Sequence, residues 1–140
     1  MAAVLALLTL PLIATPAGAA GGDPGPAPFH VSAPSVSMDH TNTVFVTLTV
    51  SCIDQAVAEG AEVDIDATVV QGTGWNQVSG AGADEVVCAP GVQTVAIPIV
   101  GNGGGFHPGA AQVFVEFQGC ISTQCIQAFG DSYLVLHRPR

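Results

Sequence analysis

Basic side chains are almost absent from this sequence. Arg138 and Arg140 are the two basic residues among 140, lysine does not occur, and eleven acidic residues bring the formal net charge to −9. A protein that binds nucleic acid neutralises phosphates with lysine and arginine, so the composition argues against a nucleic-acid partner. Attraction to an anionic membrane surface is disfavoured for the same reason, whereas a cationic partner is compatible with the charge.

Groups that could carry out catalysis or hold a metal are also scarce. Ser132 follows Gly130 and Asp131, and we expect it to begin a strand, because so short a chain has no room for the base and oxyanion hole that a serine nucleophile needs. The histidines are scattered, and no pair has a spacing typical of metal ligands. They are His30, His40, His107 and His137. The sequence therefore predicts that the protein is not an enzyme and has neither a metal nor a cofactor.

The first twenty residues have the pattern of a secretory signal peptide. An apolar run at 4–14 is broken by Pro16, and Ala17-Gly18-Ala19 supplies a small-residue cleavage site. A buried first helix is the alternative. The segment is too short and too rich in proline and glycine for a membrane span, so we expect a secreted protein without a stable membrane anchor. Residues 21–28, rich in proline and glycine, are expected to form a disordered linker.

All four cysteines follow this leader. In the oxidising compartment that an exported chain reaches, they are expected to form two disulfides. They are Cys52, Cys88, Cys120 and Cys125. Three connectivities are possible, and among them we favour Cys52–Cys88 with Cys120–Cys125. A zinc site is the alternative, but the C-x-x-C spacing typical of such sites is absent and the compartment is oxidising.

Apolar and polar residues alternate most clearly at 43–52, which reads T-V-F-V-T-L-T-V-S-C and predicts a half-buried strand. No segment after the leader has the helical period. Further strands are expected at 29–38, 61–70, 76–79, 84–88, 92–100 and 110–119 and within the segment 126–138 that closes the domain, with 53–60 as a polar connector and 80–82 as a break. About seven short strands separated by turn signals predict an all-β fold, an antiparallel β-sandwich formed by a single domain at 29–138.

Several of these segments together resemble a known group of proteins. A T-x-T-V-x-C strand, a V-D-I-x-A-T-V-V-Q strand, a returning Cys88, a Q-T-V-x-I-P-I strand, an F-H-P-G-x-A turn and a late cysteine pair follow one another. This order is similar to that of small secreted actinobacterial proteins of unknown function, and the resemblance implies an immunoglobulin-like sandwich. The G-C-I-S-T-Q-C stretch at 119–125 has a weaker resemblance to neocarzinostatin-type apoproteins, which implies a bound chromophore.

The best candidate for a partner contact is Trp75, the single tryptophan, which lies between Gly74 and Asn76 in a predicted loop. An exposed aromatic side chain in a loop is a plausible anchor for a protein or glycan. Packing of its ring against the edge of the sandwich is the alternative. Phe106 and His107, beside the F-H-P-G turn, are further candidates for the same contact.

A second candidate is an acidic face formed by Glu62, Asp64 and Asp66, which alternate along one predicted strand. Such a stripe could attract a cation or a basic partner. The alternative is a solvated strand face whose charges discourage pairing between sheet edges. A flat strand face does not provide the converging oxygens of a calcium site.

These features predict a secreted, non-catalytic binding or interaction module whose partner is a protein or a cell-wall glycan. The first alternative is a carrier of a small apolar ligand, which would need a deep apolar cleft near Cys120 and Cys125. The second is a structural component of the envelope or matrix, which would associate with itself at an open edge strand.

Overall fold

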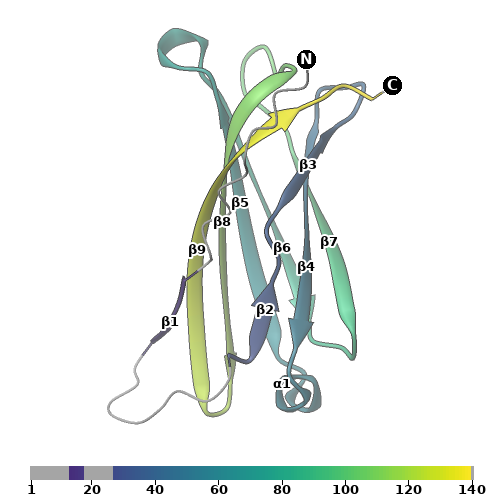
Figure 1. Cartoon of the computed structure of the whole chain (residues 1–140), viewed down its shortest axis with the longest axis vertical. Helices are drawn as coiled ribbons and strands as arrows, with labels where there is room; N and C mark the ends of the chain where they lie inside the picture. The colour runs from purple at the N-terminus through teal and green to yellow at the C-terminus, as the bar shows by residue number, and fades with distance from the viewer. Residues whose placement is uncertain (1–12, 18–26, 140) are drawn as a thin grey trace, which may run out of the picture.

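The computed structural model describes residues 13–17 and 27–139 and arranges them in two β-sheets that pack face to face (Figure 1). The strands are β1 (Ile13–Ala17), β2 (Phe29–Val31), β3 (Ser35–Met38), β4 (Val44–Cys52), β5 (Glu62–Gln71), β6 (Val78–Val87), β7 (Val92–Ile99), β8 (Gly109–Ile121) and β9 (Gln124–Leu136). The first sheet has five strands in the order β1-β9-β8-β5-β6. In the second sheet, β4 pairs with β2 and β3, and also with β7.

Every strand pairing is antiparallel, so the predicted all-β sandwich is confirmed. The 43–52 segment forms β4, and its alternate residues from Val44 to Val50 are almost completely buried. Successive side chains of a strand point to opposite faces of its sheet, so this alternation places the aliphatic residues of β4 in the core. Eight strands lie between Phe29 and Leu136, close to the number expected.

The core lies between the two sheets and is almost purely aliphatic. No polar side chain in the described part of the chain is buried. The largest completely buried side chains come from both sheets and from the loop before β8: Phe106, Leu48, Ile65, Ile97, Ile99 and Leu136. Burial of this kind of surface is the main force that holds a sandwich together.

The Cys52–Cys88 disulfide joins the two sheets, as favoured from the sequence. Cys52 ends β4 in the second sheet, and Cys88 follows β6 in the first, with a Cα–Cα distance of 5.9 Å. Cys120 and Cys125 form the other disulfide, across the end of the β8–β9 hairpin. Both predicted pairings are therefore confirmed.

The connector predicted at 53–60 is instead a short helix, α1 (Asp54–Glu59). Its alanines and glutamate favour the helical conformation, and Gly60 ends it with a left-handed φ of 61°. Ala56 is completely buried and holds the helix against the end of the sandwich. Six residues are too few to show a helical period, which explains why the sequence did not indicate it.

The break predicted at 80–82 is also wrong, because β6 runs through it without interruption and pairs with β5 at every residue. The glycines there have a packing role. A Cβ atom on Gly82 would lie 2.8 Å from the backbone oxygen of Pro98 in β7. Glycine thus allows the backbones of β6 and β7, which belong to different sheets, to approach closely.

Most of the predicted leader and linker, at 1–12 and 18–26, lies outside the described residues. The described part of the leader is β1, which pairs with residues 125–129 of β9. At the end of the predicted linker, the backbone oxygen of Pro28 accepts a hydrogen bond from Ile53. No helix in the described ranges is long and apolar enough to cross a membrane.

Candidate binding face

The side of the five-stranded sheet that points away from the core is the most chemically distinctive surface of the described chain. We call this surface the outer face. Along each strand, the carboxylates, amides and aromatic rings of the outer face alternate with residues that point into the core. It comprises Glu62, Asp64 and Asp66 of β5, Glu85 of β6, Gln112, Phe114, Glu116 and Gln118 of β8, and Gln127, Phe129, Asp131 and Tyr133 of β9.

One half of the outer face is strongly acidic. Asp64 lies opposite Glu85 on β6, and Asp66 lies opposite Glu116 on β8. The Glu62 carboxylate can accept a hydrogen bond from the protonated Glu85 side chain, and this bond together with the negative charge of Glu62 raises the pKa of Glu85 above its ordinary value. The acidic face predicted at Glu62, Asp64 and Asp66 is exposed, and the fold extends it to the two neighbouring strands.

The other half of the outer face carries exposed aromatic rings. Tyr133 and Phe129 of β9 expose 70% and 61% of their surface, and Phe114 of the neighbouring strand is also exposed. Glu116 lies opposite Phe129, and Phe114 lies opposite Asp131. Phe129 and Phe114 therefore each have a carboxylate as their direct neighbour across the β8–β9 pair, whereas Tyr133 lies opposite the amide of Gln112.

Two of these carboxylates are held in place by amides. Gln127 Nε2 donates a hydrogen bond of 2.6 Å to Glu116 Oε1. Gln112 Nε2 donates one of 3.2 Å to Asp131 Oδ2. Because each pair spans β8 and β9, the polar groups between the rings are ordered before any ligand arrives.

A shallow groove of about 570 Å³ crosses the outer face near the hairpin tip. Its lining combines polar groups with the disulfide: Gly60, Glu62, Asp64, Gln118, Gly119, Cys120, Cys125, Ile126 and Gln127. A second groove of about 510 Å³ shares Asp64 and Gln118 with the first and continues toward β6. The two therefore form one acidic depression along the outer face.

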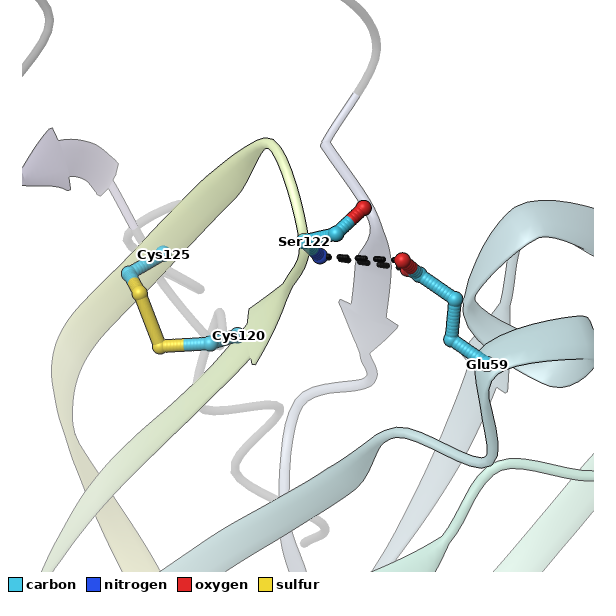
Figure 2. Close-up of a disulfide and its surroundings, with 4 residues drawn as sticks. All are labelled: Glu59, Cys120, Ser122 and Cys125. Atoms are coloured by element: carbon cyan, nitrogen blue, oxygen red, sulfur yellow. Dashed lines mark hydrogen bonds between the residues drawn. A yellow bond between two sulfur atoms is a disulfide. The ribbon is translucent and has the colours of Figure 1, made fainter.

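Helix α1 anchors the hairpin tip beside this depression. Figure 2 shows the Glu59 carboxylate facing the backbone nitrogen of Ser122, which donates hydrogen bonds of 3.1 and 3.2 Å to its two oxygens. The Cys120–Cys125 disulfide lies on the opposite side of the same turn. The tip is thus fixed by a covalent bond on one side and by a charge-assisted hydrogen bond on the other.

The residues predicted to contact a partner are not brought together as one site. Trp75 lies in a short 3₁₀ turn, η1 (Gly74–Asn76), and is fully exposed, which excludes the alternative that its ring packs on the sandwich. Phe106 is completely buried, so its prediction as a partner contact is wrong. Its ring packs over Gly101, where it closes one end of the core. His107 is exposed, and its backbone is bound by the side-chain amide of Gln71.

The outer-face residues do not form a metal site. Among the residues that the structure describes, no group of three or more histidine, cysteine, aspartate or glutamate side chains could hold an ion. The depression near Cys120 and Cys125 is open and partly polar, in contrast to the deep apolar cleft that a chromophore carrier would need.

The exposed rings of β9 were missed as a site from the sequence. Alternation along β9 places Tyr133 on the side of the strand opposite to Leu134 and Leu136. The sequence did not show, however, that β8 lies beside this strand and places Glu116 and Gln112 opposite the two rings.

Comparisons with known proteins give little further information. No protein-family model matches the chain, and no curated protein sequence matches it. A solved structure that matches is that of DesR, a β-glucosidase from Streptomyces venezuelae in complex with D-glucose. The TM-score is 0.41 and the identity 16%, and the match covers 78% of this chain and 15% of that chain.

This match corrects one expectation. The sequence predicted that the protein is not an enzyme, yet the matching solved structure is that of an enzyme, so the expectation is not maintained. Identity this low supports a fold relationship at most, and no activity or substrate is carried over to this chain. The resemblance to small secreted actinobacterial sandwich proteins stays a prediction.

Proposed function

We propose that the protein is a secreted binding module and that its outer face binds an extended glycan. The observation that carries the proposal is the combination, on one flat surface, of exposed rings at Phe129 and Tyr133 with carboxylates fixed by amides. Aromatic rings left in water on a sheet face favour contact with a partner. Sugars suit this surface because their C–H faces stack on rings while their hydroxyls bond to carboxylates and amides.

The dimensions of the surface favour an oligosaccharide over a single sugar. Phe129 and Tyr133 are four residues apart on the same side of β9, which separates them by about 14 Å at the usual rise of an antiparallel strand. Phe114 and the Gln112–Asp131 pair lie between them on the neighbouring rungs. A chain of several sugar units is needed to contact both rings.

The charge of the chain narrows the class of glycan. Four carboxylates of β5 and β6 flank the aromatic strip, and the formal net charge is −9. Polyanionic glycans would be repelled, whereas neutral glycans and amino sugars would not. Cell-wall polysaccharides of these two kinds are therefore the ligands to test first.

Secretion is supported by the two disulfides and by the cleavage pattern of the predicted leader. Disulfides persist in oxidising compartments outside the cytosol. A small-molecule carrier is less well supported, because the depression near the disulfide is open to solvent and lined by carboxylates and amides.

The test is retention of the protein on insoluble cell-wall polysaccharides, followed by titration with soluble oligosaccharides of increasing length. Tyr133→Ala is expected to weaken binding about tenfold, the loss typical of an aromatic anchor. Val92→Ala is the matched control, because Val92 is also 70% exposed but lies on β7 of the other sheet. Retention of no neutral or amino-sugar polysaccharide, or an equal loss in both variants, would refute the proposal.

A further inference from the structure

Strand β9 is a long strand that lies next to the short edge strand β1 in the five-stranded sheet. It has thirteen residues and pairs with β8 over its whole length. On its other side, the described residues provide the five-residue strand β1, which pairs with Cys125–Phe129. A long edge with free backbone N–H and C=O groups is a template for pairing with another strand.

The other edges of the sandwich carry features that discourage such pairing. Strand β6 has the exposed carboxylates Asp84 and Glu85, and β7 contains Pro98, which cannot donate a backbone hydrogen bond. Strands β2 and β3 are short and are separated by a segment with Pro34. In contrast, β9 contains neither proline nor lysine. Its one charged residue is Asp131, which already accepts a hydrogen bond from Gln112.

Strand β1 shows that the β9 edge accepts an antiparallel strand. It lies within the segment expected to be removed with the leader. The described residues of the hydrophobic core lie between Phe29 and Leu136 and come from both sheets. Removal of the leader would leave the edge of β9 uncovered at Cys125–Phe129.

We propose that, once the leader has been removed, the edge of β9 pairs with β9 of a second copy in a two-fold dimer. A two-fold axis at Phe129 places the two Phe129 rings side by side on the outer face. The same register sets Gln127 opposite Asp131 and Cys125 opposite Tyr133, so no two carboxylates face each other. Cross-strand aromatic and amide–carboxylate pairs of this kind stabilise a sheet.

The neighbouring elements favour this register. The last residues of β9 lie close to β3 at one end of the sandwich (Figure 1), so the pairing is centred away from that end, at the residue where the contact with β1 stops. An axis at Asp131 would instead bring two carboxylates together, which is destabilising. Net repulsion between two acidic chains is screened beyond about 8 Å at physiological ionic strength.

The test is the mass in solution of two chains, the full chain and one that begins at Ala20, measured by light scattering after size exclusion from 1 to 100 µM. The full chain is expected to be monomeric, because β1 covers the pairing site. The shorter chain is expected to have twice the mass of one chain at the higher concentrations. No ligand is present, so the result does not depend on glycan binding.

Phe129→Lys in the shorter chain is expected to give a monomer, because it puts two ammonium groups side by side at the axis. Val100→Lys is the matched control and should leave the dimer intact, because it makes the same charge change at a site that is exposed by 72% and distant in sequence from β9. Circular dichroism would verify that both variants are folded. A shorter chain that stays monomeric, a dimer that survives Phe129→Lys, or mass that grows without limit would overturn the proposal.

Discussion

The disulfide between the two sheets should stabilise the protein more than the disulfide at the hairpin tip. The perturbation is the paired substitution of Cys52 and Cys88 by alanine, with the same substitution of Cys120 and Cys125 as the comparison. The first bond closes a loop with a sequence separation of 36, and the second closes one of 5. Both changes remove the same atoms, so the difference between them reports on the length of the loop.

The expected magnitudes follow from the entropy that each cross-link removes from the unfolded chain. For a separation of 36 the free energy of unfolding should fall by about 4 kcal/mol, and for a separation of 5 by about 2 kcal/mol. For a domain of this size, a loss of about 4 kcal/mol lowers the melting temperature by about 15 °C. The sandwich should still fold without the first disulfide, although its remaining stability would be small.

The assay is urea denaturation followed by far-ultraviolet circular dichroism under non-reducing conditions, with one denaturant slope fitted to each variant. A larger slope in the Cys52–Cys88 variant would indicate a more expanded unfolded state, which the entropic argument requires. If the two variants lost equal stability, or if loss of the hairpin disulfide cost more, loop entropy would not be the main contribution of these bonds.

Two further predictions concern the packing between the sheets and the acidic half of the outer face. Gly82→Ala should lower the free energy of unfolding by about 1–3 kcal/mol, because its Cβ atom would lie 2.8 Å from the Pro98 oxygen. Gly104→Ala, which has open space around it, should change that free energy by less than about 0.5 kcal/mol. Glu85→Gln should stabilise the protein at pH 7 and low salt, because the Glu62 side chain raises the pKa of Glu85 in the folded state and its ionised form is therefore unfavourable there. The stability gained by this substitution should fade as the pH falls through the raised pKa of Glu85. Denaturant midpoints of both proteins across the pH range would measure this gain. A gain that grows in acid would contradict the reasoning.

Period-two alternation was sufficient to predict the central strand and the fold class. It identified β4 to within one residue, because both the burial and the pairing of that strand follow from its own side chains. The turn at Asp39 is equally local, since its carboxylate accepts hydrogen bonds from the backbone of Thr41 and Thr43. These features depend on neighbours in the sequence.

Features that depend on distant neighbours could not be predicted in this way. Phe106 stands among glycine, histidine and proline, so nothing in its local sequence indicated that its ring would close the core over Gly101. The glycines of β6 were interpreted as a break in the strand. They are needed because the backbone of β7, in the other sheet, lies close to them, and such a contact cannot be recognised in the sequence. The candidate binding face is of the same kind: Phe129 and Tyr133 belong to β9, whereas the residues opposite them, Glu116 and Gln112, belong to β8.

The full exposure of Trp75 has a practical consequence for spectroscopy. It is the single tryptophan, and its indole is already surrounded by water in the folded protein. Unfolding therefore hardly changes its environment, and its fluorescence is a poor probe of stability. The same property makes the emission of Trp75 a clean reporter of anything that settles on the loop between β5 and β6, because no other indole contributes to the signal.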